Sequence, residues 1–251
     1  MSNKITTLGE LQIGEVPYIV GTIASFASLN QFASSKIDIC DIVEVRLDEI
    51  GENSQWLEGC KEIESSGMPI ILTIRLKSEG GKWNKPDKLR LPLFLDAVNN
   101  LSCVDIELDS DLMEEVSELG RVQQKPVLIS YHNFENTPTL GELKEIATRA
   151  AKYGALVKIS TMAKTPEDLI ALQKLMECDF SVPLCVIGMG AFGTRTRVSF
   201  PTMGSCLTYG YLDAPSAPGQ LSARKLNEQL RLILPKYNEQ FIIKKQILEY
   251  A

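Results

Sequence analysis

The chain has 251 residues, of which 44% are hydrophobic and 23% charged, a balance that excludes a disordered or low-complexity protein. Lys and Arg number 26 and Asp and Glu 32, so the formal net charge is −6. This acidic balance argues against a nucleic-acid-binding protein, which would carry a basic excess.

The cysteines and the N-terminal region exclude further classes. None of the six cysteines stands at a Cys-x-x-Cys spacing, and His132 is the only histidine, so a zinc site is not expected. The apolar stretch at 16–27 is too short and too interrupted to cross a membrane. Since no signal peptide precedes it, we expect a cytoplasmic protein with reduced thiols.

One pattern recurs along the chain: a short run rich in Val, Ile and Leu, then polar residues, then a longer amphipathic stretch. The apolar runs predict eight strands near residues 18–25, 41–50, 69–75, 103–108, 126–132, 156–161, 183–189 and 205–212. Their spacing is close to the length of one βα unit.

The segments between these runs are predicted to be helical. The weakest pattern covers 34–41, and stronger ones cover 139–154, 165–178 and 222–234. In the third, Thr165 is suited to cap the helix and Pro166 to be its first residue. Pro235 is expected to end the last helix.

Eight apolar strands alternating with helices predict a parallel sheet covered on its outer face. Eight units in about 250 residues match a closed (β/α)8 TIM barrel of the α/β class, as a single domain over 1–251. A doubly wound open sheet is the alternative. It would need a glycine-rich phosphate loop after the first strand, which residues 21–28 do not provide.

In such a barrel the reactive groups lie at the carboxyl ends of the strands. In the second strand Glu44, Arg46 and Asp48 alternate with aliphatic residues, which predicts either an internal ion-pair ladder or a ligand site. Arg75 ends the third strand, and Glu79 follows it in a loop that contains two glycines.

The fifth and sixth strands carry an imidazole and an amine. His132 ends the fifth strand, and any imidazole chemistry must use it. Lys158 stands between Val157 and Ile159, so by alternation it faces the barrel interior. Burial and nearby cations favour a free amine able to attack a carbonyl. The alternative is an ion pair with Glu107 or Glu44 across the interior.

Two loops complete the set. The glycine-rich segment 188–205 contains Arg195 and Arg197, and a guanidinium there suits a carboxylate or a phosphate. The loop after the eighth strand offers Ser216 and Gln220 for hydrogen bonding.

Taken in order, these segments resemble the type I 3-dehydroquinate dehydratases over about residues 18–234. The resemblance rests on VEVRLD (43–48), TIRLKSEGG (73–81), SYHNFENTP (130–138), VKIS (157–160), MGAFGTRTR (189–197) and SAPGQ (216–220). Each motif alone is weakly specific, but six in the right order make a strong match.

The resemblance implies a hydro-lyase of the shikimate pathway, which serves chorismate and aromatic amino-acid biosynthesis. It would convert 3-dehydroquinate to 3-dehydroshikimate with no metal or organic cofactor. Lys158 would form a Schiff base with the C3 ketone, His132 would shuttle protons, and Glu79 would orient His132. The family is often dimeric, so a homodimer is expected.

The resemblance also implies how the substrate is held. Arg197 would bind the carboxylate with help from two residues of the closing loop. The ring hydroxyls would be bound by three residues of the second and third strands. The two loop residues are Ser216 and Gln220, and the three strand residues are Glu44, Arg46 and Arg75.

Some positions depart from the family pattern or leave a choice open. Asn133 replaces the Asp that commonly follows the active-site His, and Thr196 stands where Ser is frequent. The contact from the first strand is open between Thr22 and Ser25. A class I aldolase and a non-catalytic barrel remain alternative functions. The C-terminal stretch shows no dinucleotide fingerprint, so no fused shikimate dehydrogenase domain is expected.

Overall fold

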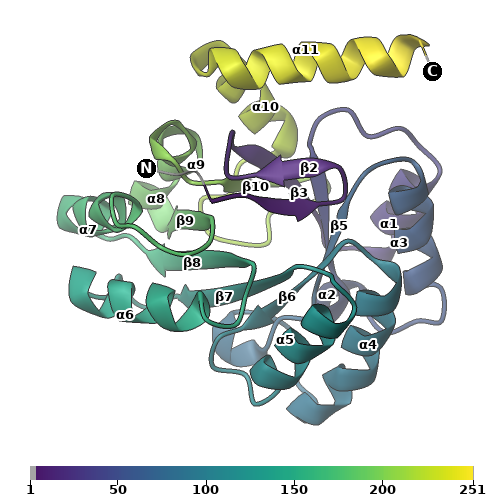
Figure 1. Ribbon diagram of the computed structural model, residues 1–251, viewed down its shortest axis with the longest axis horizontal. Helices are drawn as coiled ribbons and strands as arrows, with labels where there is room; N and C mark the ends of the chain where they lie inside the picture. The colour runs from purple at the N-terminus through teal and green to yellow at the C-terminus, as the bar shows by residue number, and fades with distance from the viewer. Residues whose placement is uncertain (1–3, 251) are drawn as a thin grey trace.

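Eight parallel strands form the centre of the molecule, and helices surround them (Figure 1). The computed structural model describes residues 4–250. The strands are β3 (Tyr18–Ile23), β4 (Ile42–Arg46), β5 (Ile70–Thr73), β6 (Cys103–Glu107), β7 (Val127–Asn133), β8 (Leu156–Met162), β9 (Leu184–Met189) and β10 (Leu207–Tyr211).

The strands pair in chain order from β3 to β9, and β10 pairs with β3. At the remaining seam between β9 and β10, the Cys206 amide donates to the Leu184 carbonyl at 3.0 Å. The sheet is therefore nearly closed. The predicted (β/α)8 TIM barrel is confirmed, and the open doubly wound sheet is wrong.

The second predicted strand is too long. It ends at Arg46, and residues Leu47–Ile50 form the short helix α2. The turn brings the Asp48 carboxylate back to the Arg46 guanidinium, with Oδ1 3.0 Å from Nε and Oδ2 2.8 Å from Nη2. Asp48 is thus outside the strand, and the predicted alternation of three charges along one strand face is wrong there.

Helices cover the outside of the barrel. The longer ones are α1 (Phe26–Ala33), α3 (Trp56–Ser65), α4 (Leu91–Asn100), α5 (Met113–Val122), α6 (Leu140–Ala150), α7 (Pro166–Met176), α10 (Ala223–Ile233) and α11 (Pro235–Tyr250). Two short helices, α8 (Gly190–Gly193) and α9 (Thr196–Ser199), follow β9. The 3-10 turns are Lys77–Glu79, Asp87–Arg90 and Phe200–Met203.

Local capping signals identified the helix ends well. Thr165 caps α7 and Pro166 is its first residue, as predicted, because the Thr165 hydroxyl accepts from the Asp168 amide. Pro235 ends α10 and also begins α11. The predicted helix at 34–41 is wrong: Ser25 caps a helix at 26–33 instead, and its hydroxyl accepts from the Ser28 amide.

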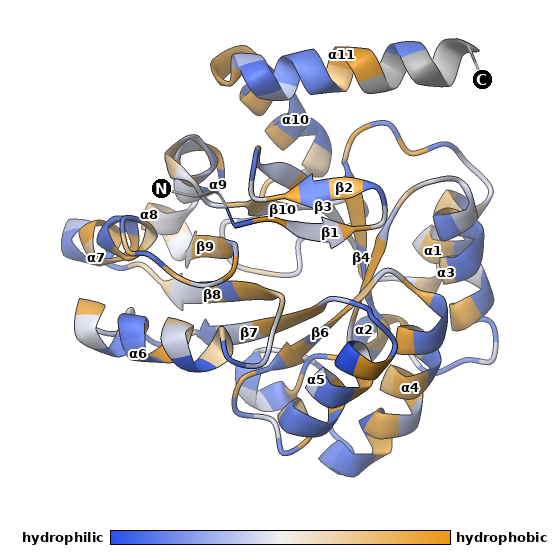
Figure 2. Ribbon diagram, in the orientation of Figure 1, coloured by the Kyte–Doolittle hydropathy of each residue, from blue (hydrophilic) through white to orange (hydrophobic). Residues whose placement is uncertain are grey.

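The main core lies between the outer face of the sheet and the helices. Val157 and Ile159 of β8 point outward into this layer, which also contains Leu172 and Leu175 of α7. Burying one such side chain stabilises the fold by about 1.5–3 kcal/mol. Figure 2 shows the same division, with apolar strands inside and polar residues on the outer helices.

A hairpin that the sequence patterns did not predict closes the amino-terminal end of the barrel. It consists of β1 (Thr6–Leu8) and β2 (Leu11–Ile13). Leu8 and Ile13 are fully buried in a second core with the first residues of the barrel strands, such as Ile42 and Leu156. These strands are too short for a period-2 pattern to be recognised.

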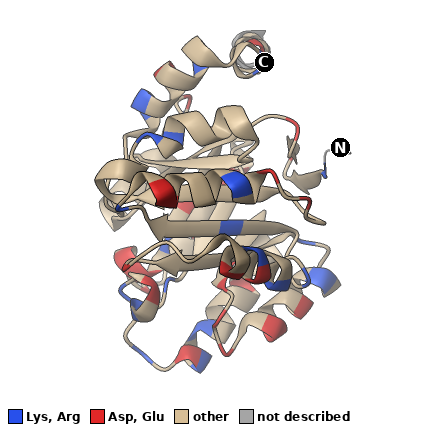
Figure 3. Ribbon diagram, turned by 90° about the vertical axis from the view of Figure 1, so that its left-hand side faces the viewer, with Lys and Arg blue, Asp and Glu red and all other residues tan. Residues whose placement is uncertain are grey.

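The outer surface carries both signs of charge, and Figure 3 shows them interspersed over the helices. No helix within residues 4–250 is long and apolar enough to span a membrane. The assignment of residues 1–251 to one domain stays a prediction.

Candidate active site

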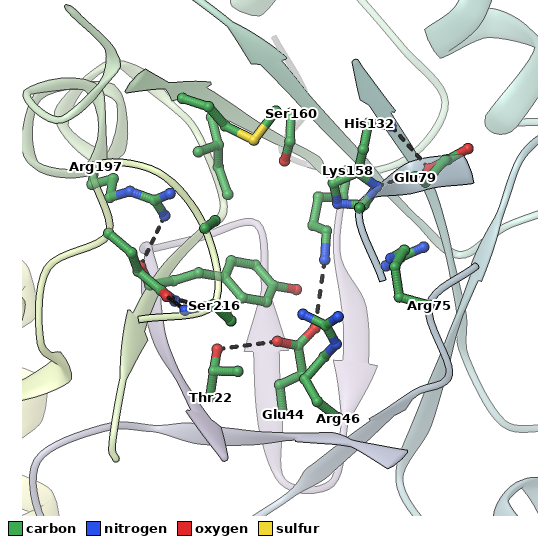
Figure 4. Close-up of a pocket in the computed structure, with 16 residues that line it drawn as sticks. Thr22, Glu44, Arg46, Arg75, Glu79, His132, Lys158, Ser160, Arg197 and Ser216 are labelled. Carbon is green, nitrogen blue, oxygen red and sulfur yellow. Dashed lines mark hydrogen bonds and ion pairs between the residues drawn. The ribbon is translucent and has the colours of Figure 1, made fainter. Parts of the chain in front are cut away.

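A cavity opens at the carboxyl ends of the barrel strands (Figure 4). Its empty volume, including the mouth that opens to solvent, is about 480 Å³. All the site residues expected from the sequence line it: Glu44, Arg46, Arg75, Glu79, His132, Lys158, Arg197, Ser216 and Gln220. Thr22, Ser160, Ile187, Met189 and Tyr209 also line it.

Lys158 lies on β8 with its side chain inside the barrel and only 4% of its surface exposed. Its Nζ is 2.8 Å from Oδ2 of Asp105 and 3.6 Å from Oε1 of Glu44. The expected Glu44 partner is therefore present. The other expected partner, Glu107, instead pairs with Arg75 and Arg90.

Asp105 is a site residue that the sequence reasoning missed. It is fully buried on β6 and accepts hydrogen bonds from the Arg75 guanidinium, the Ser130 hydroxyl and the Lys158 amine. Burial raises the pKa of Asp105, but Arg75 and Lys158 outweigh this effect and hold it well below its usual range. The sequence does contain a signal for it, because Asp105 alternates with Val104 and Ile106 and is therefore expected to face the barrel interior.

His132 and Glu79 form a second buried pair. Nδ1 of His132 is 2.9 Å from Oε2 of Glu79, which also accepts from the His132 amide at 3.0 Å. Burial, together with Arg75 and Lys158, lowers the pKa of His132 well below its usual value. Burial, reinforced by nearby carboxylates, raises the pKa of Glu79 to about 8. The imidazole is therefore a neutral proton acceptor when Glu79 is ionised.

The loop after β5 carries Glu79 to this position, and its glycines make that possible. Gly80 has a φ of +77°, and a Cβ there would collide with the ring of Phe134. The amide of Gly81 donates to the Leu76 carbonyl at 2.9 Å and closes the loop. A larger residue at Gly80 would therefore strain the loop that carries Glu79.

Arg46 and Arg75 line the cavity but are also bound within the protein. Arg46 pairs with Asp48, whose side chain is completely buried. The Arg75 guanidinium contacts Asp105 at 2.6 Å, Glu107 at 3.2 Å and the Ser130 hydroxyl at 2.7 Å. Both arginines therefore help to position the carboxylates and set the charge around Lys158 and His132.

Arg197 differs from the other cationic residues of the cavity. It is 3% exposed, and Nη1 donates to the Tyr209 carbonyl at 3.0 Å. Its Nε has no partner, and none of the carboxylates whose side chains the structure describes forms an ion pair with it. Burial lowers the pKa of Arg197 to about 10, so the group remains a cation at neutral pH. A buried, unpaired guanidinium is suited to an anionic ligand.

The seam of the barrel positions Arg197. The hydroxyl of Thr196 accepts from the Gly188 amide of β9, and the Thr208 hydroxyl of β10 donates to the Arg197 carbonyl. The short helix α9 thus bridges the two strands that do not form a regular ladder. Arg195, the alternative carboxylate ligand, is exposed and does not line the cavity.

The loop after β10 covers one side of the cavity. The Ser216 amide and hydroxyl both donate to Oε1 of Gln220, at 2.7 and 3.1 Å. The Pro218 carbonyl accepts from the Gly190 amide and ties this loop to α8. Figure 4 shows Ser216 and Arg197 on one side of Lys158, and His132 with Glu79 on the other.

Known proteins share this arrangement of strands and motifs. The family model for type I 3-dehydroquinase matches residues 23–236. The chain belongs to the type I 3-dehydroquinase family. The family consists of hydro-lyases of the shikimate pathway, so the aldolase and non-catalytic alternatives are not supported.

Individual relatives agree with this assignment. A 3-dehydroquinate dehydratase of Methanothrix thermoacetophila is 35% identical over 226 residues, covering 87% of this chain and 93% of its own. The type I 3-dehydroquinate dehydratase structure from Clostridium difficile is 25% identical, with a TM-score of 0.83 and coverage of 92% and 98%. The structure from Aquifex aeolicus is 29% identical, with a TM-score of 0.77 and coverage of 86% and 98%.

Two open points of the family comparison can be placed in the structure. Thr22 donates to Oε2 of Glu44 at 3.0 Å and lines the cavity, whereas Ser25 caps α1 outside it. Asn133 donates to Asn136 and accepts from the Glu135 and Asn136 amides. It therefore shapes its own loop, and Glu79 is the side chain bonded to the imidazole.

Proposed function

We propose that this enzyme dehydrates 3-dehydroquinate to 3-dehydroshikimate through a Schiff base on Lys158. The observation that carries the proposal is the position of the Lys158 amine. It lies inside a cavity that also holds the imidazole of His132 and the unpaired cation of Arg197. An amine, a proton shuttle and an anion-binding group are what a β-elimination from a keto acid requires.

The first half of the reaction forms the covalent intermediate. Lys158 transfers its proton to His132, and the free Nζ attacks C3 of the ketone to form a carbinolamine. This intermediate loses water with proton transfer through His132 and leaves an iminium ion. The positive iminium acidifies the C2 hydrogens, because the electron pair left by deprotonation is delocalised as an enamine.

The second half eliminates the hydroxyl and frees the enzyme. Nε2 of His132 removes the C2 proton and then protonates the C1 hydroxyl, which leaves as water as the C1–C2 double bond forms. Hydrolysis of the conjugated iminium consumes one water and releases 3-dehydroshikimate and the Lys158 amine. The water lost in imine formation balances the water used in hydrolysis, so the net release is one water.

The remaining cavity residues bind the substrate in this proposal. Arg197 pairs with the carboxylate, supported by Ser216 and Gln220 of the covering loop. Glu44, Arg46 and Arg75 face the hydroxyl-bearing part of the ring. Related chemistry is consistent with this, because the type I enzyme from Clostridium difficile has been solved with covalent modified comenic acid.

Borohydride reduction tests the covalent step. The enzyme is incubated with 3-dehydroquinate, reduced, digested and mapped by mass spectrometry, with Lys158→Met as the matched control. We expect one adduct, on Lys158, and none in the variant. A mark on another residue, or turnover with no trapped adduct, would overturn the assignment.

Absorbance and size measurements test the remaining expectations. Appearance of the conjugated enone in the ultraviolet reports product, and we expect its rate to be unchanged by EDTA because no metal takes part. Within the described residues, no cluster of three or more His, Cys, Asp or Glu side chains is arranged to hold a metal. Light scattering tests the predicted homodimer.

A further inference from the structure

The hydroxyl of Tyr209 is a feature of the cavity that the reaction scheme leaves unused. Tyr209 lies on β10 and is 4% exposed, and its side chain lines the cavity beside Lys158. Its Oη is buried and has no hydrogen-bond partner among the side chains and backbone that the structure describes. A buried polar group without a partner costs about 1–3 kcal/mol, so its retention calls for a reason.

Two contacts hold the rest of this residue in place. Nζ of Lys158 lies 4.3 Å from the centre of the Tyr209 ring, a cation–π geometry. The main-chain carbonyl of Tyr209 accepts from the Arg197 guanidinium at 3.0 Å. The ring therefore contacts the amine while the backbone contacts the anion-binding group, and both contacts would be made equally well by phenylalanine.

We propose that Tyr209 is a substrate-binding residue whose hydroxyl donates a hydrogen bond to a ring hydroxyl oxygen of the substrate. The proposal rests on the proposed function, and it adds a specificity contact for a polyhydroxylated ring. A ligand hydroxyl is a suitable acceptor because it can accept from Tyr209 while it donates to a neighbouring carboxylate.

Glu44 is the carboxylate that fits this arrangement. It also lines the cavity, and its two oxygens are oriented by the hydroxyls of Thr22 and Thr73 at 3.0 and 2.9 Å. Oε1 also faces the Lys158 amine, whereas Oε2 keeps a further lone pair for a ligand. Burial, with Glu44 the foremost charge acting on it, raises the pKa of Tyr209 well above its usual value. The phenol therefore stays protonated and serves as a donor.

The test compares Tyr209→Phe with the wild type and with Tyr153→Phe. The control loses a hydroxyl that bonds to Glu114 at an exposed position away from the cavity. We expect Tyr209→Phe to lower kcat/KM for 3-dehydroquinate roughly 3- to 10-fold, the value of one hydrogen bond. The melting temperature of the ligand-free variant should be unchanged or higher, because an unpaired buried group is removed. Tyr153→Phe should leave kcat/KM unchanged.

Deoxy analogues of 3-dehydroquinate, used as competitive inhibitors, identify the contact. The penalty of Tyr209→Phe should disappear for the analogue that lacks the partner hydroxyl and persist for the others. An unchanged kcat/KM, an equal penalty for every analogue, or a lower melting temperature with parallel loss of activity would each overturn the proposal. If the wild type fails to turn over 3-dehydroquinate, both the proposed function and the Tyr209 proposal fail. If the wild type is active but Tyr209→Phe gives one of the results above, only the Tyr209 proposal fails.

Discussion

Lys158 and Arg197 are both buried cations in one cavity, yet their partners differ. Lys158 is flanked by the carboxylates of Asp105 and Glu44, whereas Arg197 has a single carbonyl partner. Removing Lys158, Asp105 or Glu44 therefore leaves a buried charge without its partner. Removing Arg197 instead relieves an unpaired charge, so its loss should affect ligand binding more than folding.

Arg197→Gln should therefore raise KM and reduce kcat/KM. The loss of charge-assisted hydrogen bonds worth about 1.5–3 kcal/mol corresponds to roughly 10- to 150-fold. Steady-state kinetics measure this effect, and thermal unfolding should show no loss of stability in the ligand-free protein. Arg195→Gln is the matched control, since that guanidinium is exposed and outside the cavity. Equal losses in both variants would contradict the role of Arg197.

The buried pair of His132 and Glu79 predicts the pH dependence. The two groups share a hydrogen bond and titrate as a unit. Because the pKa of Glu79 is raised to about 8, the pair gains a proton as the pH falls below that value and loses its capacity to act as a base. We expect kcat/KM to rise with pH and to level off above about 8.

Glu79→Gln separates the titration of the Glu79 carboxyl group from that of the His132 imidazole. Without the carboxyl group, the imidazole titrates alone, and its pKa lies well below 6.5. The rising limb of the kcat/KM profile should therefore move from about pH 8 to below pH 6.5. The plateau should also fall, because the ring loses its orienting partner. A limb that stays near pH 8 in the variant would exclude the pair as its source.

Among the elements, the loop after β5 depends most on its glycines. The loop must fold back sharply to bring Glu79 from the end of one strand to His132 at the end of another. Gly80 has a positive φ and lies against Phe134, so both its backbone conformation and its surroundings disfavour a side chain. The position of Glu79 beside His132 therefore depends on the positive φ of Gly80.

Gly80→Ala should lower both activity and stability. We expect a destabilisation of about 1–3 kcal/mol from the strained backbone, together with a loss of kcat as Glu79 moves away from His132. Gly51→Ala is the control, because Gly51 also has a positive φ of +85° but has no atom within 4 Å of an added Cβ. Chemical denaturation and kinetics should show a stability loss in both variants, but an activity loss only at Gly80.

At the scale of the whole molecule, the two ends of the barrel have separate tasks. The carboxyl end holds the charged cavity, and the amino end is closed by the β1–β2 hairpin with an apolar layer beneath it. Figure 1 shows that α11 lies beyond α10, outside the ring of helices. Its start is held by Tyr237, whose hydroxyl donates to Oδ2 of Asp41 at 3.0 Å.

Leu8→Ala tests this separation. The side chain is fully buried under the barrel, so its truncation should lower the free energy of unfolding by about 2–5 kcal/mol. Below the unfolding transition kcat and KM should be unchanged, because Leu8 lies at the amino end of the barrel and does not line the cavity. Ile5→Ala, at a site that is 46% exposed, should cost much less. A change of KM in Leu8→Ala would show that the two ends are coupled.

The repeat of strands and helices could be predicted from the sequence, because hydrophobic periodicity and capping are local properties. It placed seven of the eight barrel strands within about two residues at each end, and it identified Thr165 and Pro166 at the start of α7. It also located Lys158 inside the barrel, since side chains alternate along a strand. The hairpin at Thr6–Ile13 was missed because its strands are three residues long.

Which charged groups meet could not be predicted in this way, because it depends on how the strands are packed together. Residues separated by 53 positions, such as Lys158 and Asp105, come together because strands β6 to β8 are neighbours in a closed sheet. The absence of an ion-pair partner for Arg197 and of a hydrogen-bond partner for the Tyr209 hydroxyl, among the residues that the structure describes, is likewise a property of the packed interior. Periodicity assigns a side chain to a face of its strand, whereas its partner depends on register and barrel closure.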